Sequence, residues 1–169
     1  MIPDNQHLVL IGMMGVGKTT VSRIVGERLG RRVVDTDHVI EARTGRSVRE
    51  IFADDGEQAF RALESEALLE ALTEQEPVVL AAAGGIVLSE QNRTALRDSP
   101  SKVVWLCADP ATLVERVRSG GHRPLLDDDP EGTLRKMFEE RSPLYRQVAD
   151  AIVLVDGRSV NDVVEAVLR

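Results

Sequence analysis

The chain has 169 residues, of which 43% are hydrophobic and 29% charged, and its formal net charge is −7. This balance predicts one globular domain with a single core, and the excess of acidic residues disfavours a nucleic-acid partner. A lone cysteine excludes a disulfide framework, and a polar N-terminus without any apolar run near the ~20 residues of a membrane span predicts a cytoplasmic protein with no membrane partner.

Short apolar runs rich in Val, Ile and Leu recur along the chain and are typical of strands covered on both faces. The stretches between them place apolar residues at helical spacing, and several begin with a capping residue, such as Ser47, Asp109 and Ser159. This alternation predicts an α/β fold in which a parallel sheet lies between two layers of helices. The predicted strands are 8–11, 32–34, 78–82, 103–108 and 151–155.

The first predicted strand leads directly into GMMGVGKT, residues 12–19, which fits the phosphate-loop pattern G-x-x-x-x-G-K-[ST]. Gly15 and Gly17 allow the backbone to curl so that successive N–H groups face one anion. The helix that opens at Lys18 adds free N–H groups and a positive dipole end. Lys18 is expected on the β- and γ-phosphates and the Thr19 hydroxyl on Mg²⁺. The motif predicts nucleotide-dependent phosphoryl transfer, and the lack of an N-K-x-D sequence argues against a signalling GTPase.

The second predicted strand is followed by two carboxylates, Asp35 and Asp37, separated by Thr36. Strand ends in an open parallel sheet face the ligand crevice, and strand alternation predicts that both carboxylates point to the same side. One would assist Mg²⁺, directly or through water, and the other would accept the proton of an attacking hydroxyl group. The alternative is that both aspartates only cap a turn and the following helix.

Residues 37–71 have a helical pattern that is too long for one crossover and is broken at Gly45 and Gly56, so they predict a helical insertion beside the sheet. Arg61 and Glu64 lie three residues apart within it. They form either a surface ion pair or a pair in which Glu64 holds the Arg61 guanidinium for a substrate carboxylate.

The third predicted strand ends in Ala-Gly-Gly at 83–85, which either lets backbone approach a ligand or makes a simple turn. Residues 119–129, SGGHRPLLDDD, predict a mobile loop with a glycine hinge. Arg123 lies in this loop and Arg141 beyond it. An arginine in a closing loop suits the charge on a transferring phosphoryl group, although a single arginine is more often a solvated surface charge.

Together these segments are similar to the shikimate kinase family over nearly the whole chain. The similarity is carried by GMMGVGKT, DTD, IFADDGEQAFRALE, AGG, RPLL and RSPLYRQVAD, in the family's order. It implies a single P-loop kinase domain over residues 1–169, with a five-stranded parallel sheet, a substrate-binding helical segment at about 37–71 and a mobile lid at about 119–129. It also implies that the chain uses ATP and Mg²⁺ to phosphorylate the 3-hydroxyl of shikimate, a step of chorismate and aromatic amino-acid biosynthesis. We expect the chain to be a monomer.

The resemblance implies roles for the residues at matching positions. The residues implied to be catalytic are Lys18, Asp37 and Arg123. The residues implied to bind ATP are Gly15, Val16, Gly17, Lys18, Thr19, Thr20, Arg118, Arg123 and Arg158. The residues implied to bind shikimate are Asp37, Arg61, Gly84, Gly85 and Arg141. The residues implied to serve Mg²⁺ are Thr19 and, through water, Asp35.

The chain departs from the family pattern at two positions. Ala83 stands where the family usually has a glycine, and Val160 where it often has a proline. If position 83 needs a positive φ, alanine there costs roughly 1 kcal/mol; otherwise its methyl group only narrows the loop.

The residues also allow two other functions. One is a kinase of similar architecture that acts on a sugar acid or a nucleoside monophosphate, against which IFADDGEQAFRALE argues. The other is a nucleotide-binding regulatory protein without turnover. The joint presence of Lys18, Thr19, Asp35, Asp37 and Arg123 argues against such a loss of catalysis.

Overall fold

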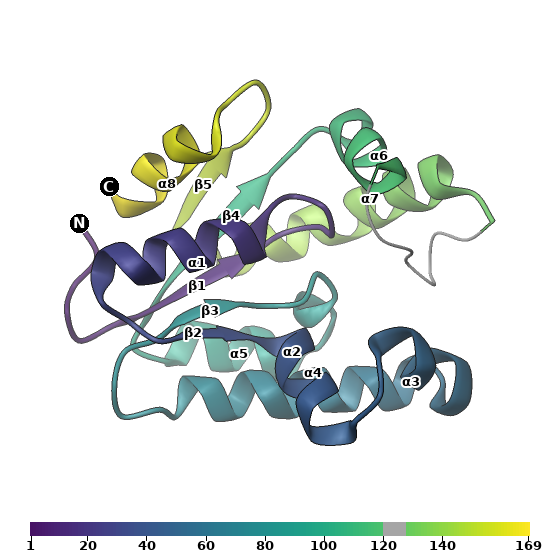
Figure 1. The fold of residues 1–169 in the computed structure, drawn as a ribbon, viewed down its shortest axis with the longest axis horizontal. Helices are drawn as coiled ribbons and strands as arrows, with labels where there is room; N and C mark the ends of the chain where they lie inside the picture. Colours follow the sequence, from purple (N-terminus) through teal and green to yellow (C-terminus); the bar gives the residue numbers. More distant parts are fainter. Residues whose placement is uncertain (120–127) are drawn as a thin grey trace.

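The computed structural model describes residues 1–119 and 128–169. Its strands are β1 (His7–Ile11), β2 (Val33–Asp35), β3 (Val79–Ala81), β4 (Ser101–Cys107) and β5 (Ala151–Leu154). They form one sheet in the order β2-β3-β1-β4-β5, and every neighbouring pair is parallel (Figure 1). The predicted five-stranded parallel sheet is confirmed, and each predicted strand overlaps an observed one to within two residues at either end.

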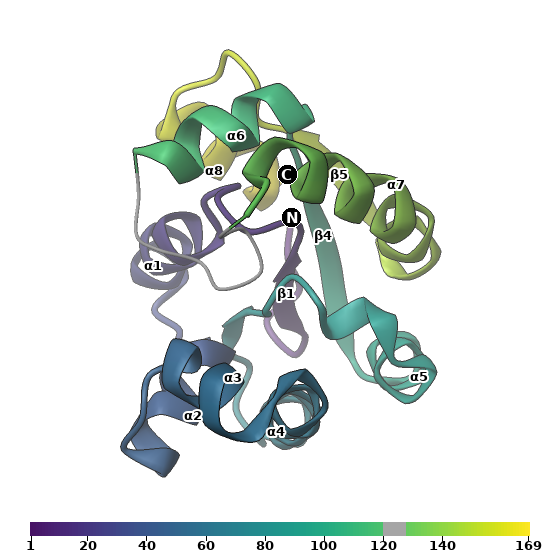
Figure 2. The same cartoon turned by 90° about the vertical axis from the view of Figure 1, so that its right-hand side faces the viewer.

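Helices cover both faces of this sheet. They are α1 (Lys18–Leu29), α2 (Thr36–Thr44), α3 (Val48–Asp55), α4 (Glu57–Leu72), α5 (Glu90–Asp98), α6 (Pro110–Arg118), α7 (Pro130–Val148) and α8 (Val160–Leu168), with a 3-10 turn, η1 (Ile86–Leu88). Helices α1 and α8 pack together on one face, and α5 and α7 pack on the other (Figure 2). The predicted three-layer α/β/α arrangement is therefore confirmed.

Several helices begin where the capping residues predict. Ser47 and Glu50 form a reciprocal capping box at the start of α3, and Ser159 and Asp162 form another at the start of α8. Asp109 accepts a hydrogen bond from the first turn of α6. Each such cap contributes about 1 kcal/mol to helix stability, so local sequence fixes where these helices turn away from the sheet.

The segment predicted as a helical insertion forms three helices, α2, α3 and α4, which are separated at Gly45 and Gly56. These helices lie at the β2 edge of the sheet (Figure 1). They share a small apolar cluster of their own, formed by Ile40, Ile51 and Phe60 with one alanine, whereas the end of α4 joins the main core around Leu68. The insertion therefore has its own packing, and it joins the main core through the end of α4 and contacts β2 through α2.

The main core lies between the sheet and its helices. The inward residues of β1, β3 and β4 are almost completely buried, as the continuous apolar runs predict. Within the described ranges, no helix is both long enough and apolar enough to cross a lipid bilayer. Most of the predicted lid at 119–129, including Arg123, lies outside the described residues.

Candidate active site

The loop between β1 and α1 has the geometry of a phosphate cradle. Gly15 and Gly17 have φ angles of 81° and 103°, in the left-handed region that favours glycine. Lys18 is the first residue of α1, where backbone N–H groups have no partner within the helix. Its Nζ donates hydrogen bonds to the carbonyl oxygens of Gly12, at 2.7 Å, and Met13, at 3.0 Å. The ammonium group therefore lies across the loop.

A cavity of about 230 Å³ lies in front of this loop, between the carboxyl ends of β2 and β3. Among the residues predicted to bind ATP, it is lined by Gly15, Gly17, Lys18, Thr19 and Thr20. Val16 is buried in the core. Any contact that Val16 makes with a nucleotide would therefore come from its backbone.

Thr19 and Asp35 meet at the side of the phosphate cavity. The Thr19 hydroxyl donates to Asp35 Oδ2 at 2.8 Å, and both residues line the cavity. A hydroxyl and a carboxylate are hard oxygen ligands of the kind Mg²⁺ prefers. Thr19 and Asp35 are therefore the residues that could hold such an ion here.

The two aspartates reach one cavity for a reason other than strand alternation. Strand β2 ends at Asp35, and Asp37 lies in the first turn of α2. Asp35 Oδ1 accepts a hydrogen bond from Asp37 N at 3.0 Å and so caps that helix. Strand alternation is therefore not the reason that the two aspartates lie together, and that part of the prediction was wrong. The shared location is right, because the helix begins immediately after the strand and Asp37 stays at the sheet edge.

A second, smaller cavity adjoins the phosphate cavity and is lined by all five residues predicted to bind the acceptor: Asp37, Arg61, Gly84, Gly85 and Arg141. Asp37 and Gly84 line both cavities. The second cavity thus has a carboxylate where it meets the phosphate loop and two guanidinium groups within its walls. This arrangement suits a small hydroxylated anion with its hydroxyl towards the phosphates.

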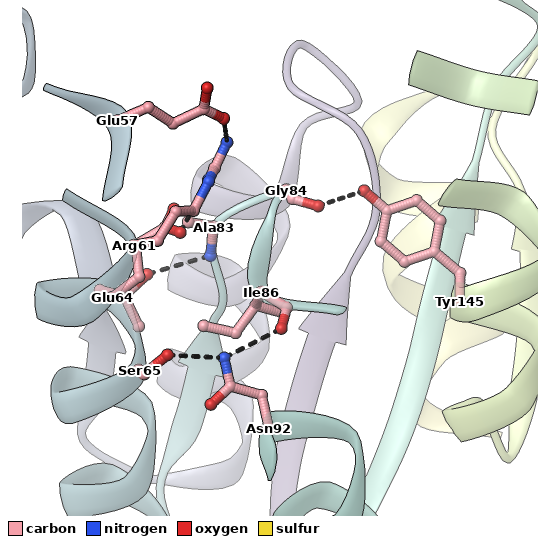
Figure 3. Close-up of polar contacts among 10 residues, drawn as sticks. Glu57, Arg61, Glu64, Ser65, Ala83, Gly84, Ile86, Asn92 and Tyr145 are labelled. Carbon is pink, nitrogen blue, oxygen red and sulfur yellow. Dashed lines mark hydrogen bonds and ion pairs between the residues drawn. The ribbon is translucent and has the colours of Figure 1, made fainter. Parts of the chain in front are cut away.

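Arg61 is held by carboxylates of its own helix (Figure 3). Its Nη1 donates to Glu64 Oε2 at 2.7 Å and its Nη2 to Glu57 Oε1 at 3.1 Å. The Glu64 side chain is only 2% exposed, so this pair is not the solvated surface pair that its spacing allowed. Burial raises the pKa of Glu64, and the Arg61 guanidinium opposes that rise. Glu64 therefore determines the direction in which the Arg61 guanidinium points.

Position 85 needs a glycine because there is no room for a side chain, and not because of its backbone conformation. Its φ is −85°, which any residue adopts, but a Cβ at this position would overlap the Cζ and Nη1 atoms of Arg61. Ala83 is unstrained, since no non-glycine residue in the described chain has a positive φ. The conformational cost considered for Ala83 therefore does not arise, and its methyl group only lines the cavity.

Arg141 and Tyr145 approach the glycine pair from α7. Arg141 is 4% exposed, unlike a solvated surface arginine. The Tyr145 hydroxyl donates to the Gly84 carbonyl oxygen at 2.5 Å (Figure 3). Burial raises the pKa of Tyr145 to about 12, with Arg141 opposing that rise, so the hydroxyl keeps its proton at neutral pH.

Sequence reasoning missed several residues of the site. Val48, Phe52 and Phe60 form an apolar wall of the second cavity, and their only sequence signal is their place in the helical pattern of residues 37–71. Arg116 was also missed. It donates from α6 to the carbonyl oxygen of Val16 at 3.1 Å, and nothing in the local sequence indicates this contact.

The remaining predicted residues lie apart from the two cavities. Arg118 is exposed at the end of α6, and Arg158 is exposed in the turn before α8. Neither is among the residues that line the cavities described above. Arg123 lies outside the described residues. The roles of these three arginines remain predictions.

Comparisons with known proteins agree on one family. The family model described as shikimate kinase matches residues 14–169. A shikimate kinase of Symbiobacterium thermophilum is 46% identical over 166 residues, which cover 96% of this chain and 94% of the relative.

Solved structures give the same result. A shikimate kinase of Acinetobacter baumannii in complex with shikimate has a TM-score of 0.91 and 36% sequence identity, covering 96% of this chain and 90% of that one. A shikimate kinase of Bacteroides thetaiotaomicron has a TM-score of 0.85 and 30% identity, with 95% of each chain covered.

Proposed function

The chain belongs to the shikimate kinase family, and we propose that it transfers the γ-phosphoryl group of ATP to the 3-hydroxyl group of shikimate. Its reaction is the ATP-dependent phosphorylation of shikimate in aromatic amino-acid biosynthesis. The observation that carries the assignment of the site is the shared wall of the two cavities. Asp37 and Gly84 line both of them, so an acceptor in one lies next to phosphates in the other.

On the nucleotide side, the loop N–H groups and the start of α1 would hold the β- and γ-phosphates. Lys18 would leave the carbonyl oxygens of Gly12 and Met13 and follow the charge on the transferring group. Mg²⁺, held by the Thr19 hydroxyl, by Asp35 through water and by the phosphates, would neutralise that charge. Arg118, Arg123 and Arg158 are proposed to complete the nucleotide site.

On the acceptor side, Arg61 and Arg141 would bind the shikimate carboxylate, and the Gly84–Gly85 backbone would lie against the ring. Support comes from the two guanidinium groups and the glycine pair in one cavity wall. Asp37, at the junction with the phosphate cavity, would bind the attacking hydroxyl and accept its proton. Because the transition state of phosphoryl transfer is loose, orienting the hydroxyl is the larger part of that task.

A coupled assay of ADP release tests this function. We expect saturable turnover with shikimate and none with gluconate or nucleoside monophosphates. Removing divalent cations with EDTA should abolish turnover, and added Mg²⁺ should restore it. Turnover with gluconate but not with shikimate would contradict the proposal. Saturable ATP binding without turnover on any acceptor would instead favour a regulatory protein.

The close approach of Arg61 to Gly85 predicts how a methyl group added at position 85 would affect the KM for shikimate. Gly85→Ala should raise the KM for shikimate about tenfold, because the new Cβ displaces the guanidinium that binds the carboxylate. The KM for ATP should change less than twofold, since Gly85 does not line the phosphate cavity. Steady-state kinetics with each substrate varied in turn measures both values, and an unchanged shikimate KM would remove Gly85 from the site.

We further propose that the chain works as a monomer in the cytoplasm, with ATP and shikimate as its partners and without a nucleic-acid or membrane partner. The acidic net charge of −7 supports the absence of a nucleic-acid partner. Light scattering should give a mass near 18.5 kDa, and twice that mass would contradict the monomer.

A further inference from the structure

The backbone from Ala83 to Ile86 is held at three points by buried side chains of three different helices. The Ala83 N–H donates to Thr36 Oγ1 of α2 at 3.0 Å. The Gly84 carbonyl accepts from Tyr145 of α7, and the Ile86 carbonyl accepts from Asn92 Nδ2 of α5 at 3.0 Å (Figure 3). Thr36 and Tyr145 are 0% exposed and Asn92 2%. The segment is thus anchored on both sides of its glycine pair.

These three hydrogen bonds act on a segment that has little means of its own to hold one backbone conformation. Gly84 and Gly85 have no side chains to pack, and glycine loses more backbone freedom on ordering than any other residue. Their fit is nevertheless tight. Even a Cβ on Gly84 would lie 3.3 Å from the Gly12 carbonyl oxygen of the phosphate loop, and Gly85 faces the guanidinium of Arg61. A small shift of this backbone would therefore change the space beside Arg61.

Thr36 has a particular place among the three anchors. It lies between Asp35 and Asp37, and its hydroxyl crosses from α2 to the segment after β3. One hydrogen bond thus connects the junction of β2 and α2, which carries the two aspartates, to the glycine pair. None of Thr36, Asn92 and Tyr145 is among the residues that line the acceptor cavity. Thr36 and Asn92 therefore act on the acceptor through the backbone that they hold, whereas Tyr145 also lies beside Arg141.

We propose that Thr36, Asn92 and Tyr145 are positioning residues for the acceptor site, which hold the Gly84–Gly85 backbone against Arg61 and thereby set the affinity for shikimate. This inference rests on the proposed location of shikimate in that cavity. It assigns a role to the central residue of the DTD motif, whose two aspartates alone have roles in the proposed reaction.

Three threonine variants test the first anchor. Thr36→Val keeps the branched shape but leaves the Ala83 N–H without its acceptor, and we expect the shikimate KM to rise roughly five- to tenfold. Thr36→Ser keeps the acceptor and should stay within twofold of the wild type. Thr44→Val is the matched control, because it removes a half-buried hydroxyl from the other end of α2, where that hydroxyl bonds to the Ile40 carbonyl. It should lower Tm without changing the shikimate KM.

Tyr145→Phe tests the second anchor together with the contact that Tyr145 makes with Arg141. It removes one hydroxyl with little change in shape and should also raise the shikimate KM several-fold. The effects of Thr36→Val and Tyr145→Phe should be non-additive in the double variant, because both act on one segment. Calorimetric titration with shikimate gives the same comparison as a Kd without turnover.

The outcomes separate this inference from the function on which it rests. A wild-type chain that neither binds nor phosphorylates shikimate contradicts the proposed function. A wild-type chain that does so, together with Thr36→Val and Tyr145→Phe variants whose shikimate KM and Kd stay within twofold, overturns the positioning role. Equal losses in Thr36→Val and Thr36→Ser also overturn it, since a side chain that keeps the hydroxyl acceptor would then support shikimate binding no better than one that lacks it.

Discussion

Replacing Lys18 with alanine should lower kcat at least a hundredfold, and towards a thousandfold, while the fold stays intact. The side chain provides the charge that lies across the phosphate loop, and removing one such preorganised donor from a site of developing charge typically costs a factor of 10²–10³. In the ligand-free chain it also bonds to the carbonyl oxygens of Gly12 and Met13. Those bonds are partly exposed, so their loss should shift Tm only slightly.

Steady-state ADP release measures this loss, and calorimetric titration with ATP separates binding from chemistry. Lys136→Ala is the control, because Lys136 is a surface lysine that is 77% exposed and 3.9 Å from Glu140. It should leave kcat unchanged. A near-normal kcat in Lys18→Ala would contradict the assignment of the loop between β1 and α1 as the phosphate site.

Replacing Arg61 with alanine should lower kcat/KM for shikimate by at least tenfold, approaching a hundredfold. The variant loses a charge-assisted contact with the substrate carboxylate, for which a tenfold loss corresponds to about 1.4 kcal/mol. The KM for ATP should change little, since Arg61 lines only the acceptor cavity of the two. Arg43→Ala is the matched control, because Arg43 forms an exposed ion pair with Glu70 on the same helical insertion.

The Arg61→Ala variant should also have a distinct pH dependence of stability. Glu64 is buried, which already raises its pKa above the usual 4.5, and removing Arg61 takes away the main opposing charge. The folded variant then holds a proton that the unfolded chain releases. Its free energy of unfolding should therefore fall as the pH rises from about 4.5 through the raised pKa of Glu64. At neutral pH the free energy of unfolding of the variant should be lower than that of the wild type by an amount of order 3 kcal/mol.

Denaturant unfolding from pH 4.5 to 8 measures this slope. The double variant Arg61→Ala and Glu64→Gln should lose the slope, because glutamine does not titrate. A single variant whose stability does not depend on pH in this range would show that Glu64 does not need Arg61 to remain charged. An unchanged kcat/KM for shikimate would remove Arg61 from the acceptor site.

Local patterns predicted those parts of the molecule that local physics determines. Apolar runs without alternation predicted the five strands, and the spacing of GMMGVGKT predicted the loop, the curled backbone at Gly15 and Gly17, and the start of α1 at Lys18. Capping residues located the starts of α3, α6 and α8. Each of these features depends on residues that lie close together in the sequence.

Contacts between distant segments were not predictable in the same way. Helical spacing made Arg61 and Glu64 neighbours, but only the packing of α4 against its neighbouring helices shows that Glu64 is buried. The bonds from Thr36 to Ala83 and from Tyr145 to Gly84 join residues 47 and 61 positions apart. No pattern within a single segment carries that information, and the position of Asp37 likewise depended on where β2 ended.

The separate apolar cluster of the helical insertion has a consequence for how this enzyme can diverge. Ile40, Ile51 and Phe60 pack within α2, α3 and α4, while the sheet keeps its own core. Phe60 also belongs to the wall of the acceptor cavity, and no residue of that cluster lines the phosphate cavity. Mutations in the cluster can therefore reshape the acceptor pocket while the nucleotide machinery is inherited unchanged. The packing of the insertion can thus change separately from the core that carries the phosphate loop.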